Sequence, residues 1–162
     1  MSEKAAPKTI QVVTFSIKGR HYAIEVGEDK SMKEIVKNDQ EITVISGAPE
    51  FVLGVVNLRG QVVPILNLGQ LLGFTDCEVK LGEGFVLILL DGPNGKFGLT
   101  ADQVYQIHTI DSDYMEEPTG VLDGNNFIVR LIKELKGSAI SGIVTLLDPM
   151  KIYARCVSRE QI

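Results

Sequence analysis

Apolar and polar residues alternate along two short stretches near the start of the chain. Apolar side chains occupy every second position from Val13 to Ile17 and again from Tyr22 to Val26. A period of two is typical of strands that bury one face. The intervening Lys18-Gly19-Arg20 carries turn residues, so the pattern predicts a β-hairpin.

A second hairpin is predicted over Gly54–Leu68, where two apolar strands flank Arg59-Gly60. Pro64 lies inside the second of these strands and cannot donate a ladder hydrogen bond. We therefore expect that strand to lie at a sheet edge or to carry a bulge. The following Gly69–Gly73 is predicted to form a short helical cap.

The rest of the pattern predicts more short strands and no long amphipathic helix. The segment around residues 31–38 has no clear period and supports no assignment. The further elements are a strand at Ile42–Ile45, a single helical turn at Ala48–Leu53, a polar connection at 74–84, a buried strand at Phe85–Leu90, a turn at Asp91–Gly95, strands at Lys96–Ala101 and Val104–Ile110, an acidic loop at Asp111–Pro118, and a final strand pair at Phe127–Leu135 and Ile143–Leu147 around Lys136-Gly137-Ser138.

A weak internal repeat links the two halves of the chain. Tyr22–Val26 resembles Phe97–Ala101, 75 positions later, and Ile65–Leu71 resembles Leu146–Ile152, 81 positions later. Each half has about five predicted strands, and a five-stranded sheet can close into a small barrel. Two barrels of roughly 75 residues would be marginally stable alone, so we expect them to pack on one another.

Composition supports a mostly β protein of one ordinary domain. Among 162 residues, valine and isoleucine contribute 33 and alanine only 7. The apolar run Phe85–Leu90 is far shorter than the ~20 residues that span a bilayer. No signal-peptide pattern begins the chain, which predicts a cytoplasmic protein without direct membrane insertion. The net charge of −5 argues against nucleic-acid binding.

Motifs for catalysis or for metal and cofactor binding are not found. His21 and His108 lie in opposite halves without partners at ligand spacing, so each is interpreted as structural or exposed. Cys77 and Cys156 are interpreted as incidental thiols in a reducing compartment. The glycine-rich stretch Leu81–Gly84 and the Asp91–Gly95 turn lack the lysine and hydroxyl residue of a phosphate-binding loop. We expect no enzymatic activity.

Two features allow other interpretations. Phe85–Asp91 is an apolar strand that ends in aspartate, as in receiver domains, but alternating helices and an acidic pair near the N-terminus are missing. Arg59 at the tip of an apolar hairpin is either a solvated turn residue or an arginine held by a carboxylate at a binding surface. The residues alone indicate a β-rich interaction domain.

The segment Pro49–Leu68 resembles the hallmark motif of the CheW family, the coupling proteins of bacterial chemotaxis. Coverage extends over about residues 9 to 153. The other matching segments are Phe15-Ser16-Ile17 and Tyr22–Val26 in the opening hairpin, Lys33-Glu34-Ile35 at the acidic position before the third strand, Gly98–Val104, and Val144–Asp148 in the closing strand.

The resemblance implies two intertwined five-stranded SH3-like barrels with short helices. They would form a single CheW-like domain over 9–162, behind a flexible leader at 1–8. Members of this family have no catalytic activity and need no cofactor. They couple the cytoplasmic tips of chemoreceptors to the histidine kinase CheA, whose regulatory domain resembles CheW. The chain would thus be cytoplasmic and recruited to receptor arrays at the inner face of the membrane.

The resemblance also implies where partners bind. By motif position, the family's partner-binding determinants correspond to the region of Glu34, Gly54, Asn57, Leu58, Arg59 and Gly60, and Met32 and Val104 are candidates for an apolar receptor groove between the barrels. We hypothesise an ion pair between Arg59 and Glu34 at the partner-binding surface.

A CheW-like module of a larger kinase or receiver-containing protein is the alternative. The leading methionine and the chain end soon after the last strand favour a free-standing adaptor.

Overall fold

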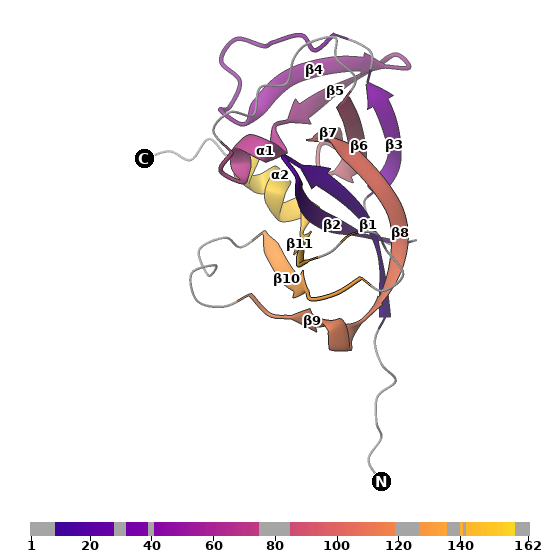
Figure 1. Cartoon of the computed structure of the whole chain (residues 1–162). Helices are drawn as coiled ribbons and strands as arrows, with labels where there is room; N and C mark the ends of the chain where they lie inside the picture. The colour runs from indigo at the N-terminus through magenta and orange to yellow at the C-terminus, as the bar shows by residue number, and fades with distance from the viewer. Residues whose placement is uncertain are drawn as a thin grey trace.

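The computed structural model describes residues 9–27, 32–38, 41–74, 85–118, 127–135, 140 and 142–157. Its elements confirm a mostly β fold with short helices (Figure 1). The strands are β1 (Thr9–Ile17), β2 (Arg20–Val26), β3 (Met32–Asn38), β4 (Val52–Leu58), β5 (Gln61–Leu66), β6 (Phe85–Gly92), β7 (Gly95–Ala101), β8 (Gln103–Asp111), β9 (Met115–Glu116), β10 (Ile128–Ile132) and β11 (Val144–Leu147), and the helices are α1 (Leu68–Leu71), the 3-10 turn η1 (Ser112–Tyr114) and α2 (Pro149–Val157).

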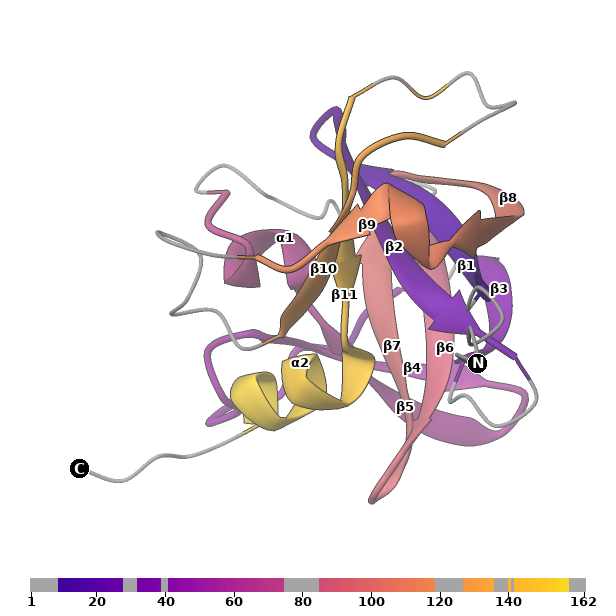
Figure 2. The same ribbon diagram turned by 90° about the horizontal axis from the view of Figure 1, so that it is seen from below.

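The strands form two sheets that exchange hairpins. The first barrel is the five-stranded sheet β3-β6-β7-β5-β4, and the second barrel is the six-stranded sheet β8-β1-β2-β11-β10-β9. The N-terminal hairpin β1–β2 belongs to the second barrel, and its repeat-related hairpin β6–β7 belongs to the first (Figure 2). The barrels are therefore intertwined, and neither corresponds to one half of the sequence. Parallel pairs, β2 with β11 and β5 with β7, join each exchanged hairpin to its new sheet.

One apolar core lies between the two sheets, and each barrel also has its own. Phe15 of β1, Ile88 of β6 and Ile152 of α2 belong to the shared core and are fully buried. Val63 and Leu89 belong to the inner cluster of the first barrel. Because side chains alternate along a strand, β6 contributes residues both to the shared core and to the inner cluster of the first barrel.

Helix α2 lies where the internal repeat places the counterpart of the short cap predicted at Gly69–Gly73, and with nine residues it is longer than that cap. Its first turn is capped by the Asp148 carboxylate, which accepts hydrogen bonds from the backbone N–H of Met150 at 3.0 Å and of Lys151 at 3.4 Å. Aspartate before proline is a common helix start. Ile152 and Cys156, four residues apart, bury one face of the helix in the shared core.

Of the two elements predicted between β3 and β4, the strand is wrong and the helical turn is shorter than predicted. Residues 42–45 do not form a strand: Thr43 alone makes an isolated bridge with Val55, through hydrogen bonds of 2.8 and 2.9 Å. The predicted helical turn at Ala48–Leu53 is a single turn closed by Val52 N–H to Pro49 C=O, and β4 begins at Val52. The unassigned segment before them contains β3.

Pro64 does not lie in an edge strand, since β5 is flanked by β7 and β4. Pairing with β7 begins only at Ile65, so the missing N–H of Pro64 interrupts no bond of that ladder. The expected irregularity lies in the partner strand, where the register of β4 against β5 shifts between Val52 and Gly54.

Several predictions lie outside the described residues. These are the leader at 1–8, the turn at 136–138, most of the connection at 74–84, and Cys77.

Gly54 allows the Thr43 bridge to form against β4. Its φ is 152°, and a Cβ atom there would lie 2.2 Å from the Thr43 carbonyl oxygen. Only glycine combines that backbone conformation with so close an approach.

We predict that Gly54→Ala lowers the free energy of unfolding by about 3 kcal/mol or more, because backbone must move to admit the methyl group. Gly73→Ala is the matched control: its φ is 99°, but nothing lies within 4 Å of the position that a Cβ would take. That variant should cost about 1 kcal/mol from backbone conformation alone. Urea denaturation measures both, and equal losses would mean that the Thr43 segment relaxes without cost.

Burial raises the pKa of the Cys156 thiol to about 12, an effect that the nearby Arg155 charge only partly opposes. In a Cys77→Ser background, we expect Cys156 to react with a disulfide reagent at pH 8 at least ~100-fold more slowly in the native than in the urea-unfolded protein. Because the folded state holds this proton more tightly, its contribution to stability should be complete below about pH 8.5 and fall as the pH rises towards 12. Rapid native labelling at pH 8 would contradict the buried placement.

Candidate partner-binding site

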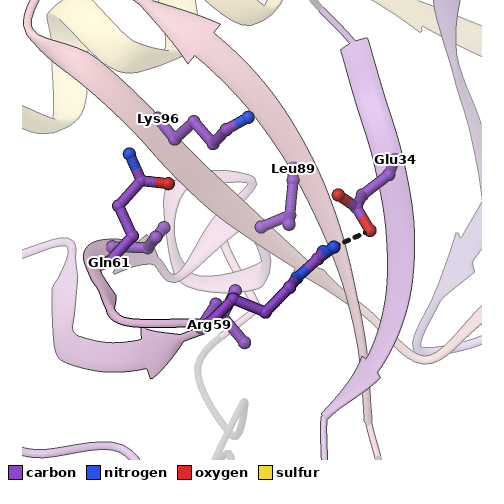
Figure 3. Close-up of a pocket in the computed structure, with 7 residues that line it drawn as sticks. Glu34, Arg59, Gln61, Leu89 and Lys96 are labelled. Atoms are coloured by element: carbon purple, nitrogen blue, oxygen red, sulfur yellow. Dashed lines mark hydrogen bonds and ion pairs between the residues drawn. The ribbon is translucent and has the colours of Figure 1, made fainter.

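A pocket opens at the mouth of the first barrel. Its volume is about 210 Å³, and its floor is the end of the inner apolar cluster of that barrel. Figure 3 shows its rim, on which charged and amide side chains surround Leu89. The lining residues are Glu34, Leu58, Arg59, Gln61, Val63, Leu89 and Lys96. We call this site the barrel-mouth pocket.

The rim follows from strand alternation. Glu34 of β3 is opposite the buried Leu89 of β6, so both side chains lie on the inner face of the barrel. Gln61 precedes the buried Val63 by two positions on β5, and Lys96 lies two positions before Gly98 on β7. On each of these strands, the inward-facing position at the end of the barrel is thus occupied by a polar residue.

The β4–β5 turn fixes Arg59 in an unusual backbone conformation. Arg59 and Gly60 both have positive φ, 53° and 83°, which is the pattern of a type I′ hairpin turn. The Asn57 side-chain oxygen accepts a hydrogen bond of 2.9 Å from the Gly60 N–H. Asn57 and Gly60 therefore shape the turn, and Arg59 presents its side chain from it.

Arg59 forms the hypothesised ion pair with Glu34. Its Nη2 lies 2.7 Å from Glu34 Oε2, and the bond joins the hairpin tip to β3 across the pocket (Figure 3). The Arg59 side chain is 71% exposed and that of Glu34 37%. Such an exposed pair contributes only about 0–1 kcal/mol to stability, so its main effect is to orient the guanidinium.

The remaining hallmark residues divide between packing and backbone. Leu58 is half-buried against the inner cluster of the first barrel and lines the pocket. Gly54 is buried under Thr43, so it acts on the backbone rather than by surface contact. The structure brings Glu34, Leu58 and Arg59 together in the pocket and keeps Gly54 out of it.

A second apolar surface lies where the outermost strands of the two sheets, β3 and β8, flank the shared core. Ile35 is opposite Ile88, and Ile107 is opposite Val13. Directly opposed side chains share a face, so Ile35 and Ile107 point towards the shared core from its margin. Their exposed fractions are 38% and 57%.

Val104 continues this surface on β8, opposite Phe15, and is partly buried against the shared core. We call Ile35, Val104 and Ile107 the inter-barrel edge. Met32 is the first residue of β3 and pairs with Leu90. It therefore lies one pairing step beyond the part of β3 that carries Ile35. Sequence analysis did not single out Ile35 and Ile107, because their place on this edge depends on β3 and β8 being outermost strands, which no local pattern shows.

Other chemistry is sparse in the described part of the chain. No group of three or more His, Cys, Asp or Glu side chains there could hold a metal ion. His21 packs its ring against Tyr105, with 5.7 Å between centroids. None of the helices in the described ranges is long and apolar enough to span a bilayer.

Comparisons with known proteins agree with this arrangement. The CheW-like domain model matches residues 11–156. The chemotaxis protein CheW of Treponema pallidum is 28% identical over 116 residues, which cover 70% of this chain and 66% of that protein. The corresponding protein of Thermotoga maritima is 28% identical over 159 residues, covering 97% and 96%.

The crystal structure of the scaffolding protein TtCheW from Thermoanaerobacter tengcongensis has the same fold. It matches with a TM-score of 0.71 at 24% identity, covering 93% of this chain and 91% of that chain. Because the family model spans most of the sequence and the fold with its exchanged hairpins agrees, this chain belongs to the CheW-like domain family.

Proposed function

We propose that this chain is a non-enzymatic adaptor that couples chemoreceptors to a CheA-type histidine kinase at the cytoplasmic face of the membrane. The observation that carries the proposal is the barrel-mouth pocket, where charged side chains surround the partly exposed Leu58 above the buried Val63 and Leu89. Exposed apolar surface with a polar rim is the usual anatomy of a protein-binding site.

The kinase regulatory domain is assigned to the barrel-mouth pocket. Arg59 is the residue best suited to anchor it, because it is mostly exposed and its guanidinium is oriented by Glu34. Arginine is enriched among residues that dominate binding energies. The strained turn conformation of Arg59 further limits the directions that its side chain can take.

The chemoreceptor tip is assigned to the inter-barrel edge. Helical tips present apolar residues at spacings of three and four, and such helices bind in apolar grooves. Ile107 is the most exposed member of the edge, with 57% of its surface accessible, and burying it would stabilise the complex. The two partners would then bind on different faces and could be held together.

We predict that the Glu34–Arg59 pair matters more for kinase binding than for folding. Arg59→Ala and Glu34→Ala should each change the free energy of unfolding by less than about 1 kcal/mol, because the pair is exposed. Each should weaken binding to the kinase regulatory domain by about tenfold or more, and the double variant should be less than additive. Calorimetric titration and urea denaturation provide the two measurements.

Arg130→Ala is the matched control, since Arg130 forms an ion pair with Glu117 on the second barrel. It should leave the kinase dissociation constant within about twofold of wild type. Strictly additive effects of the Arg59 and Glu34 variants would mean that the two residues act independently and that their ion pair has no role in binding. If the wild-type chain does not bind the regulatory domain at all, the kinase assignment itself fails.

We predict that Ile107→Asp weakens binding to a soluble receptor signalling fragment by about tenfold or more, because a carboxylate would be buried against an apolar helix. Ile143→Asp is the control: Ile143 is 61% exposed and lies next to β11, three strands from β8 in the same sheet. Both variants should keep the wild-type affinity for the kinase domain. Equal losses of receptor binding in both variants would overturn the assignment of the receptor to the inter-barrel edge.

A further inference from the structure

The barrel-mouth pocket is lined by more positive than negative charge, although the whole chain carries a net charge of −5. Two of its lining residues are cations, Arg59 and Lys96, and one is a carboxylate, Glu34. Glu34 is committed to Arg59 through the 2.7 Å ion pair. Lys96 is thus the second cation of the pocket.

Lys96 extends over the pocket from the wall opposite Arg59. In Figure 3 its side chain lies across Leu89 from Arg59, and its ammonium is directed towards the side on which Glu34 stands. Its ion pair is with Asp91, its register partner on β6, at 3.9 Å. This distance is at the long limit of an ion pair. The ammonium can therefore donate a hydrogen bond to a better-placed carboxylate without breaking a short bond.

The floor beneath these cations is apolar and almost fully buried. Val63 is 1% exposed and Leu89 is 2% exposed. A partner that covers the pocket would remove water from Lys96 and Arg59 and lower the local dielectric constant. An unpaired cation would then be costly, whereas a carboxylate placed between the two would form charge-assisted hydrogen bonds.

The size of the pocket limits its occupant to side chains. Its volume of about 210 Å³ is below the ~300–1,000 Å³ of typical small-molecule sites. One apolar side chain on the floor and one carboxylate at the rim would fill it. These two groups would come from neighbouring positions of a partner loop or strand.

We propose that Lys96 is a specificity-determining residue that makes the barrel-mouth pocket select an acidic side chain next to an apolar one on the kinase regulatory domain. This inference rests on the proposed function. It adds that the adaptor supplies a cation, Lys96, beside the Arg59–Glu34 pair, and that the partner supplies a carboxylate that binds Lys96 in place of the long contact with Asp91. A partner with a neutral residue at that position would bind more weakly.

A second copy of this chain is the competing occupant, because its acidic segment around η1 also combines carboxylates with Tyr114 and Met115. Three of its four carboxylates already have a partner within the chain, and one of these contacts, Glu116 with Lys133, is as long as the Lys96–Asp91 pair. Asp111 accepts the Asp113 N–H, Glu117 pairs with Arg130, and Glu116 lies 3.9 Å from Lys133. The kinase domain is taken as the occupant because the proposed function requires it to bind this chain, and self-association of the chain is one outcome of the test.

The test compares Lys96→Gln and Lys96→Glu with Lys133→Glu in titrations against the regulatory domain of the CheA-type kinase from the same genome. Lys133 is the matched control, because it also forms a 3.9 Å ion pair but on the second barrel. We expect Lys96→Gln to weaken binding by about fivefold and Lys96→Glu by about 30-fold or more, with a flatter dependence on salt. Lys133→Glu should stay within about twofold of wild type.

A reciprocal exchange separates recognition from a structural role. Acidic residues on the regulatory-domain surface are replaced one at a time by lysine, and one such variant should restore binding of Lys96→Glu by about tenfold. Urea midpoints of all variants monitor folding, and Lys96→Gln serves as the folded variant if the charge reversal is unstable.

Each outcome decides between the alternatives. Equal effects of Lys96→Glu and Lys133→Glu, with wild-type binding intact, would overturn this inference but not the proposed function. No binding by the wild-type chain would overturn both. Sedimentation of the chain alone identifies the third case: self-association that Lys96→Glu abolishes, with kinase binding unchanged, would make a second copy the occupant and overturn the choice of partner.

Discussion

Strands β1 and β6 are buried on both faces, and the positions of the other elements follow from that constraint. Adjacent residues Val12 and Val13 of β1, and Leu87 and Ile88 of β6, are at most 1% exposed. One member of each pair fills a barrel and the other fills the core between the barrels. The hydrophobic effect therefore holds the two sheets together through the same strands that form them.

The binding surfaces depend on this arrangement. Leu89 forms part of the pocket floor because its neighbours Ile88 and Leu90 fix β6 against the shared core. On the other sheet, Val13 and Phe15 are held in that core, and they set the positions of their register partners Ile107 and Val104. Both surfaces are margins of well-packed interiors, which keeps them rigid before a partner arrives.

Much of the fold was predictable from local sequence. The period of two and the Lys18-Gly19 and Arg59-Gly60 turns predicted both hairpins, since this information is confined to a few neighbouring residues. Residues 42–45 were mistaken for a strand because apolar residues occupy them, yet Val44 is 70% exposed. Strand β3 has no clear alternation in the sequence for two reasons. A register shift near Met32 interrupts its pairing with β6, and charged residues occupy part of the face that points away from the interior of the first barrel.

The binding site was predictable only in part. The family resemblance brought Arg59 and Glu34 together, and the ion pair is present at 2.7 Å. Lys96 could not be added from the sequence, because it reaches the pocket through the exchanged hairpin β6–β7. The parallel register that joins this hairpin to β5 leaves no local signal. Helix α2 was underestimated for a different reason: only Ile152 and Cys156 of its nine residues are buried.

The parallel pairing of β2 with β11 also sets the order of events during synthesis. The N-terminal hairpin leaves the ribosome first, but its pairing partners Thr145–Leu147 are among the last described residues to be made. At ~5–20 residues per second, that hairpin waits on the order of 6 to 25 seconds for β11. During that time β2 lacks its neighbouring strand on one side in the second barrel. The second barrel is therefore completed only after residue 147 has been translated.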